Sequence, residues 1–174
     1  MKTSMIENQI ENSKDPFIIF QVTSFNSEEE MENIESNLDQ IFTLEELEKI
    51  NNLITARVSP NVDYMIIKQS EIEDVKFMLN KCNISFTIND ITNNIWELNN
   101  IKEFVSLFGE EDPSPELTQQ IFPDIQSTFS KVYEILKLIV ESKYSTDDVL
   151  DVISEKGINS LNELHKYILE KESR

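Results

Sequence analysis

The sequence predicts an α+β protein, with a small three-stranded sheet covered by helices and a helical C-terminal part that ends in a helical hairpin. One observation is the order of patterns within residues 62–91, where an apolar run, a segment with helical spacing and an alternating run follow directly on one another. Another is the hydrophobic content of 39% with ten phenylalanines, enough apolar surface to form a core. The third is the purely helical periodicity beyond residue 125.

The N-terminal region predicts a disordered tail followed by a strand. Residues 1–15 are polar, rich in Asn, Ser and Glu, and closed by Pro16. The run FIIFQV from Phe17 has the aromatic and β-branched composition of a buried strand.

Two capping boxes predict that helices follow this strand. Ser27 with Glu30 starts an acidic amphipathic helix, and Thr43 with Glu46 starts another. The apolar face of the second helix extends through Ile54, and Ser59-Pro60 ends that helix. We therefore expect two helices, or one bent helix, over the sheet.

Residues 62–91 predict a strand, a short helix and a strand. Ser70 and Glu73 have the spacing of a capping box, which places the helix start there. A short crossover helix usually joins parallel neighbours, so we expect the flanking strands to pair. A split or incomplete ferredoxin-like order is the alternative.

Domain boundaries are predicted from composition. The stretch GEEDPSPE from Gly109 carries two prolines and a charge excess, and Pro115 suits the first helical position after Ser114. We expect an α+β domain at 16–109, a long amphipathic helix region at 114–142 and a helical hairpin at 145–172.

The long helix has a wide apolar stripe. Between residues 125 and 140 the apolar positions step by four and three. Such a stripe is usually internal core, and a homodimer seam or a partner groove is the alternative. Its members are Ile125, Phe129, Val132, Leu136 and Ile139.

Capping signals also predict the C-terminal hairpin. Thr146 begins the first helix, Gly157 ends it, and Ser160 with Glu163 begins the second.

The segments DVLD at 148–151, ISEKGI at 153–158 and Ser160-Leu161 resemble a short helical module found at the C-termini of otherwise unrelated bacterial proteins. These include some rhomboid-type membrane proteins. The likeness covers about the last sixth of the chain; Asn162, Leu164 and His165 depart from it. The resemblance implies a bacterial protein and a helical hairpin, and it implies no active site.

Charge and composition exclude several classes of protein. The formal charge of −18 repels phosphate backbones and anionic lipid, so direct nucleic-acid and membrane-surface binding are disfavoured. No window approaches the about 18–20 apolar residues that span a bilayer, and the N-terminus lacks the apolar core of a secretion signal. We expect a soluble, cytoplasmic protein. One cysteine, Cys82, and one histidine, His165, leave no soft-ligand metal site of the usual kind.

No catalytic, cofactor-binding or metal-binding residue is predicted. The two glycines lie too far apart for a phosphate-cradling loop. Cys82 falls on an apolar helix face and is interpreted as a core thiol, and His165 as a partly exposed side chain. Adjacent carboxylates such as Glu45-Glu46, Glu110-Glu111-Asp112 and Asp147-Asp148 are interpreted as solvated surface.

Partner binding is therefore the leading functional prediction. A lone tryptophan among asparagines suggests an interface anchor, together with nearby phenylalanines and the apolar faces of the C-terminal helices. The predicted contact residues are Trp96, Phe104, Phe108, Phe129, Leu136, Leu161 and Leu164. The function predicted is a non-enzymatic protein-interaction or adaptor module. One alternative is an acidic nucleic-acid mimic that inhibits a DNA- or RNA-acting enzyme; another is a carboxylate-based hydrolase or transferase that uses His165.

Overall fold

A computed structural model describes residues 15–109 and 127–173. Their contacts form two compact units, unit 1 (Met1–Ile91) and unit 2 (Thr92–Arg174). The sequence predicts a boundary at 109–114, whereas the contacts group residues 92–109 with the C-terminal helices. Residues 1–14 of the predicted tail, together with Ser114, Pro115 and Ile125, lie outside the described residues.

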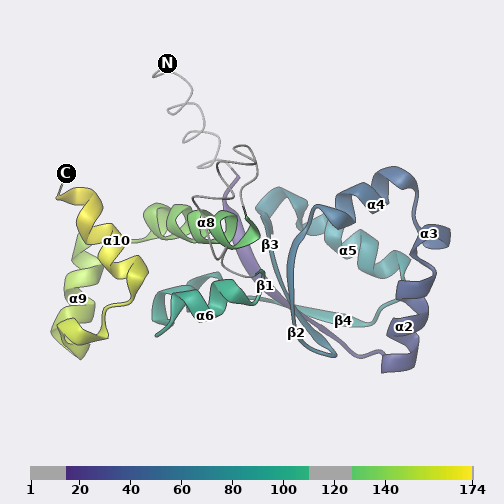
Figure 1. Cartoon of the computed structure of the whole chain (residues 1–174), viewed down its shortest axis with the longest axis horizontal. Coiled ribbons are helices and arrows are strands. Elements are labelled where there is room, and N and C mark those ends of the chain that lie inside the picture. Colours follow the sequence, from purple (N-terminus) through teal and green to yellow (C-terminus); the bar gives the residue numbers. More distant parts are fainter. Residues whose placement is uncertain (1–14, 110–126, 174) are drawn as a thin grey trace, which may run out of the picture. The chain divides into compact units, whose positions relative to one another are not determined.

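Unit 1 is an antiparallel sheet with helices over one face (Figure 1). Its elements are β1 (Phe17–Ser24), α2 (Glu28–Ser36), α3 (Leu38–Ile41), α4 (Leu44–Asn51), β2 (Ile54–Ser59), β3 (Val62–Lys68), the short 3-10 turn η1 (Gln69–Glu71), α5 (Ile72–Lys81) and β4 (Phe86–Asp90).

The sheet has four strands, and the prediction of three is wrong. The order is β2-β3-β1-β4, and every neighbouring pair is antiparallel. The missed strand is β2, which includes Ile54; α4 already ends at Asn51. β2 pairs with β3 through a hairpin at Pro60 and Asn61, and this pairing supplies hydrogen-bond partners for the backbone of β2. The stability gained from the pairing outweighs the helical spacing of the apolar residues in β2.

The expected pairing around α5 is also wrong. β3 and β4 run parallel to each other, but β1 lies between them and is antiparallel to both. This arrangement is the ferredoxin-like order, in which a strand and a helix are followed by a hairpin, a second helix and a last strand. It corresponds to the alternative order given in the sequence analysis.

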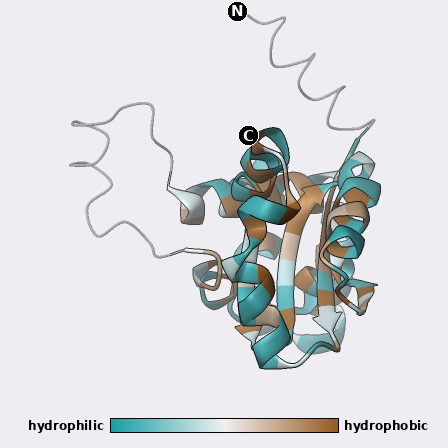
Figure 2. Ribbon diagram, turned by 90° about the vertical axis from the view of Figure 1, so that its right-hand side faces the viewer, coloured by the Kyte–Doolittle hydropathy of each residue, from teal (hydrophilic) through white to brown (hydrophobic). Residues whose placement is uncertain are grey.

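The core of unit 1 lies between the sheet and its helices. Phe20, Val22 and Ile67 of the sheet pack with Val75 of α5. In Figure 2 the helices show brown and teal stretches in alternation, as expected for helices with one apolar side.

Two predicted capping boxes form in unit 1, and a third does not. Ser27 with Glu30 and Thr43 with Glu46 make their reciprocal hydrogen bonds. The backbone N–H and the hydroxyl of Ser70 donate instead to the Asp15 carboxylate, at 2.9 and 2.7 Å.

Unit 2 is entirely helical in its described part. Its elements are η2 (Thr92–Glu97), α6 (Ile101–Ser106), α8 (Thr128–Lys143), α9 (Thr146–Lys156), η3 (Ile158–Ser160) and α10 (Glu163–Glu172). α8 packs against η2, α6 and α10, and α10 packs against α9.

The hairpin of α9 and α10 forms with shifted caps. Ser145, not Thr146, caps α9, and Gly157 ends it with a φ of 85°. Asn162, not Ser160, caps α10, with His165 in the place that the prediction gave to Glu163. No helix in the described part of the chain has the length and apolar content needed to cross a membrane.

Candidate functional site

The imidazole of His165 is buried and fully hydrogen-bonded. Nδ1 accepts the backbone N–H of Asn162 at 3.2 Å, so the ring proton belongs on Nε2. Nε2 lies 2.9 Å from the carbonyl oxygen of Trp96, to which it donates. Burial lowers the pKa of His165, although its hydrogen bond to Trp96 acts in the opposite direction. His165 is therefore buried rather than partly exposed, and it offers no free nitrogen as a general base.

Trp96 is the centre of the same network. Its ring stacks on Tyr144 with centroids 3.9 Å apart and meets the edge of His165 at 4.2 Å. The Asn162 amide donates to the carbonyl oxygens of Trp96 and Leu98, at 3.3 and 2.8 Å. This cluster joins η2 to α10 and the end of α8, so its evident role is structural.

The seven residues predicted to contact a partner are all buried. Leu136 and Leu164 are fully buried, and the other five retain less than a tenth of their surface. Apart from Leu161, they lie on η2, α6, α8 and α10 or, for Phe108, just beyond α6. They belong to the buried apolar residues of unit 2.

Cys82 lacks the features of an activated nucleophile. It is half-buried at the C-terminal end of α5. Burial raises the pKa of its thiol, and the charge of Lys81 only partly opposes this. The thiol therefore stays protonated near neutral pH.

The carboxylates of the described residues are distributed over the surface. Among these residues, no group of three or more His, Cys, Asp or Glu side chains is arranged to hold a metal ion. Of the adjacent acidic pairs, Glu45 pairs with Lys49, while Glu46 and Asp148 cap helices. Residues Glu110, Glu111 and Asp112 lie outside the described residues.

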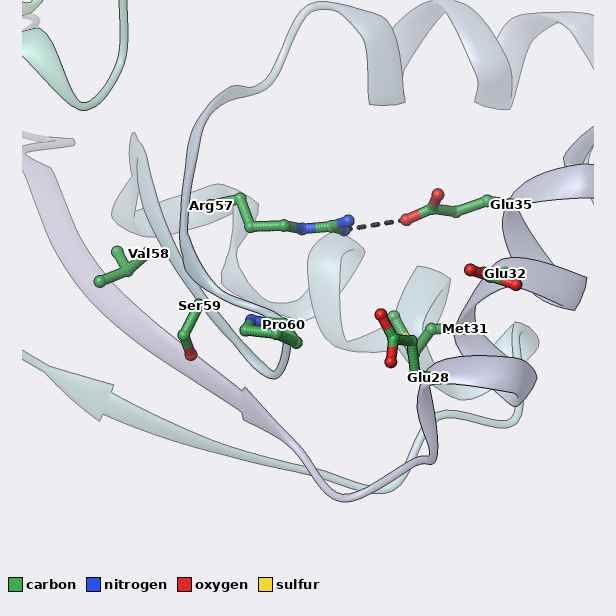
Figure 3. A pocket seen from close by; sticks show the side chains of 8 residues that line it. All are labelled: Glu28, Met31, Glu32, Glu35, Arg57, Val58, Ser59 and Pro60. Atoms are coloured by element: carbon green, nitrogen blue, oxygen red, sulfur yellow. Dashed lines mark hydrogen bonds and ion pairs between the residues drawn. The ribbon is translucent and has the colours of Figure 1, made fainter.

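A pocket in unit 1 does bring charged side chains together (Figure 3). It has a volume of about 390 Å³ and lies between α2 and the β2–β3 hairpin. It is lined by Glu28, Met31, Glu32 and Glu35 of α2 and by Arg57, Val58, Ser59 and Pro60 of the hairpin. This volume is within the range of about 300–1,000 Å³ typical of ligand sites.

Arg57 spans the pocket. Its guanidinium is 2.9 Å from the Glu35 carboxylate and 3.4 Å from that of Asp63. The hydrogen bond to Glu35 raises the pKa of Arg57. Burial raises the pKa of Asp63 even though Arg57 favours its ionised form.

The remaining carboxylates of the pocket have no cation among the described residues. Glu28 and Glu32 precede Glu35 along α2 at spacings that place all three on one side of the helix. Figure 3 shows Arg57 directed toward Glu35, with Glu28 and Glu32 farther along the same wall. The pocket is thus a mixed apolar and acidic site with one end neutralised by an internal guanidinium.

Comparison with protein-family models, with curated proteins and with solved structures finds no match to the chain. The resemblance of the C-terminal hairpin to a bacterial module consequently stays a prediction.

Proposed function

We propose that the chain is a non-enzymatic protein-interaction module whose unit 1 binds a basic segment of a partner protein at the pocket beside α2. The observation that carries the proposal is Arg57, which shows within the chain how this pocket holds a guanidinium. Its stem crosses from β2, and its charged group bonds Glu35 at 2.9 Å. A bacterial, cytoplasmic setting is part of the proposal.

The unoccupied part of the pocket suits a second basic side chain. Glu28 and Glu32 supply negative charge, while Met31, Val58 and Pro60 supply apolar surface for the methylene stem of lysine or arginine. The formal charge of −18 would draw a cationic partner toward the chain and repel a polyanion.

The binding expected here is sensitive to salt. Exposed ion pairs contribute only about 0–1 kcal/mol each, so one lysine would bind weakly. A basic segment that also buries its stems against Met31 and Pro60 gains contact area that salt does not screen.

A nucleic-acid mimic is the second candidate, supported by the row of exposed glutamates on α2. Arg57 on β2 neutralises Glu35 at one end of the acidic wall, and half of the pocket lining belongs to the hairpin. These features favour recognition of a basic protein segment over imitation of a phosphate backbone. In a hydrolase or transferase, His165 would need an accessible nitrogen, and both of its nitrogens are engaged.

The test is recovery of a partner by tagged full-length chain from its own cells at low and at high salt. Glu28→Gln/Glu32→Gln removes the two uncompensated charges of the pocket. Asp151→Asn/Glu155→Gln is the matched control, because these exposed residues of α9 have the same spacing and the same charge change.

We expect one protein to be retained by wild type and by the α9 control, and to be lost with the α2 variant or at high salt. Equal retention by all three chains, or no retained protein at all, would overturn the proposal. Displacement of the retained protein by duplex DNA would favour the mimic.

A further inference from the structure

β2, which contributes to the wall of the pocket beside α2, is an edge strand of the sheet. In the order β2-β3-β1-β4 it pairs with β3, and within the described part of the chain no strand lies on its other side. Its residues Thr55, Arg57 and Val58 are exposed. Figure 3 shows Arg57 extending from this strand toward α2. An open edge presents backbone N–H and C=O groups with which another chain can pair.

The hydrogen bonds between β1 and β3 determine which groups of β2 point outward. The N–H of Gln69 donates to the carbonyl oxygen of Pro16, and the N–H of Ser24 donates to that of Asn61, both at 2.9 Å. These two bonds lie at the ends of the pairing between β1 and β3. In an antiparallel pair every second residue bonds to the same neighbour. The residues of β3 that bond to β1 are therefore Asp63, Met65 and Ile67.

The alternate residues of β3 bond to β2, and this leaves Thr55 and Arg57 directed outward. Tyr64 is one of these alternate residues, and it lies opposite Ala56 of β2. Ala56 consequently directs its N–H and C=O groups toward β3. Its neighbours, Thr55 and Arg57, direct theirs toward the open edge.

The side chains of Thr55 and Arg57 lie on the helical side of the sheet, where the pocket is. Thr55 lies opposite Met65, which packs against the core beneath α5. Because side chains alternate between the two faces, Arg57 shares this face, and its guanidinium reaches Glu35 at 2.9 Å. In a strand paired antiparallel with β2, the side chain opposite Arg57 would lie on the same face. A basic side chain there would start at the rim of the pocket.

A bulge interrupts the edge where the pocket begins. The register of β2 on β3 shifts between Arg57 and Ser59, which makes Val58 the extra residue. Val58 is 43% exposed and lines the pocket. Since bulges end regular pairing, a segment paired with Thr55 and Arg57 would leave the sheet at this point and continue along the pocket.

Charge identifies the occupant of this edge. Arg57 is compensated by Glu35 and Asp63, whereas Glu28 and Glu32 have no cation among the described residues. A second copy of the chain, at a formal charge of −18, would add negative charge to this wall. An extended segment with lysine or arginine at every second position would place its cations on the pocket side.

We infer that the basic segment of the partner binds as an extended strand, antiparallel to β2, and adds a fifth strand to the sheet. The backbone groups of Thr55 and Arg57 bond to the segment, and its alternate basic side chains enter the pocket. The antiparallel direction matches every neighbouring pair in the sheet. This inference rests on the proposed function, because it names the conformation in which the segment occupies the same pocket.

The test uses full-length chain and short labelled peptides in which lysine alternates with threonine. One peptide carries N-methyl groups on its lysine residues, and a matched peptide carries the same number on its threonine residues. N-methylation removes a backbone donor and leaves the charge unchanged. In antiparallel pairing with the lysine side chains in the pocket, only the lysine N–H groups face β2.

We expect methylation of the lysine residues to weaken binding by about tenfold or more, and methylation of the threonine residues to leave it within about twofold. Equal weakening by both methylations, or no weakening by either, would overturn the inference. Weakening by threonine methylation alone would overturn it as well, because that pattern belongs to parallel pairing.

A pair of variants tests the same contact from the side of the chain. Thr55→Pro removes an outward N–H that does not bond to β3, which is the position where an edge strand accepts proline. Thr55→Val keeps this N–H and is the matched control. We expect Thr55→Pro to weaken the unmethylated peptide and Thr55→Val to bind it as wild type does, whereas equal binding by both would refute the pairing. A wild-type dimer that Thr55→Pro dissociates would make a second copy the occupant and would also refute it.

The Glu28→Gln/Glu32→Gln variant separates this inference from the proposed function. If it weakens every peptide while the two methylated peptides bind wild type alike, the inference fails and the proposed function stands. If it binds every peptide as wild type does, the proposed function fails and the inference fails with it. The methylated peptides need no change in the chain, so they decide the inference even where a variant does not fold.

Discussion

His165 shows how a single side chain can have a structural role that its chemistry alone does not reveal. The neutral ring completes the cap of α10 through Nδ1 and joins that helix to η2 through Nε2. A protonated ring would direct an N–H at the backbone N–H of Asn162. Burial and this donor conflict both favour the neutral form.

We predict that stability falls as pH drops below the ordinary His165 pKa of 6.5. The pKa is lowered in the folded chain, so in this range the unfolded chain binds more protons and acid favours unfolding. The stabilising effect of the neutral ring is complete above this pH.

The measurement is denaturant unfolding over a pH series for wild type and His165→Gln. Glutamine retains an acceptor for the cap and does not titrate. The variant should therefore lose the part of the pH dependence that appears as pH falls below 6.5, whereas identical pH profiles would contradict this role.

Gly157 ends α9 in a backbone conformation with a positive φ. Its φ of 85° with ψ of 161° belongs to a region that is essentially restricted to glycine. Gly157→Ala should destabilise the chain by about 1–3 kcal/mol, although a Cβ would meet nothing within 4 Å. Unfolding of Asn159→Ala, an exposed neighbour in η3, provides the control; equal stability of both variants would refute the strain argument.

Individual caps were predictable only where no distant group competed. Ser27 and Thr43 find their glutamates within one turn. Ser70 is instead engaged by Asp15, a residue 55 positions away. Sequence spacing identifies the local partner, and it contains no information about such long-range competitors.

Among the elements, β2 shows why one strand was missed. Ile54 continues the apolar spacing of α4, so local periodicity allows both a longer helix and a new strand. The partner that decides between them is β3, through backbone pairs such as Thr55 with Met65. The pocket depends on the resulting hairpin, so it could not be predicted once β2 was interpreted as helix.

The salt bridge between Lys81 of α5 and Glu46 of α4 predicts an unusually low pKa for the Glu46 carboxyl group. Hydrogen bonding from Lys81, followed by that from Thr43, lowers the pKa of Glu46 to about 2. A depressed folded pKa means that this link stabilises the chain above the ordinary value of 4.5 and weakens as pH falls toward 2.

NMR titration of side-chain carboxylates measures this directly. Lys81→Met should raise the pKa of Glu46, because it removes the hydrogen bond that lowers this pKa most. The titration of Glu30, in the capping box of α2, should not change. A Glu46 pKa that stays equally low in Lys81→Met would contradict the link.

For the whole molecule, charge dominates the expected behaviour. A formal charge of −18 opposes compaction through self-repulsion, and exposed ion pairs contribute little in return. We predict that raising ionic strength from low to physiological values raises the thermal midpoint, because salt screens the repulsion. A midpoint that falls with added salt would show that specific ion pairs outweigh the repulsion.

The division into units is also a property of the whole chain. The α+β class and the helical C-terminal region follow from periodicity, and both were predicted. Clustered proline and charge predict a boundary near Gly109, whereas the contacts divide the chain after Ile91. Residues 101–108 have an apolar face, and contacts between α6 and α8 group them with the C-terminal helices.

We propose that unit 1 recognises a basic segment of a partner at the pocket beside α2. The most direct measurement is amide NMR of the full-length chain titrated with a short peptide rich in lysine and arginine. Amides in α2 and in the β2–β3 hairpin should be perturbed, while those of α9 should be unaffected. Perturbations spread equally over the acidic residues of α9, or absent from α2 and the hairpin, would show that the pocket is not the binding site.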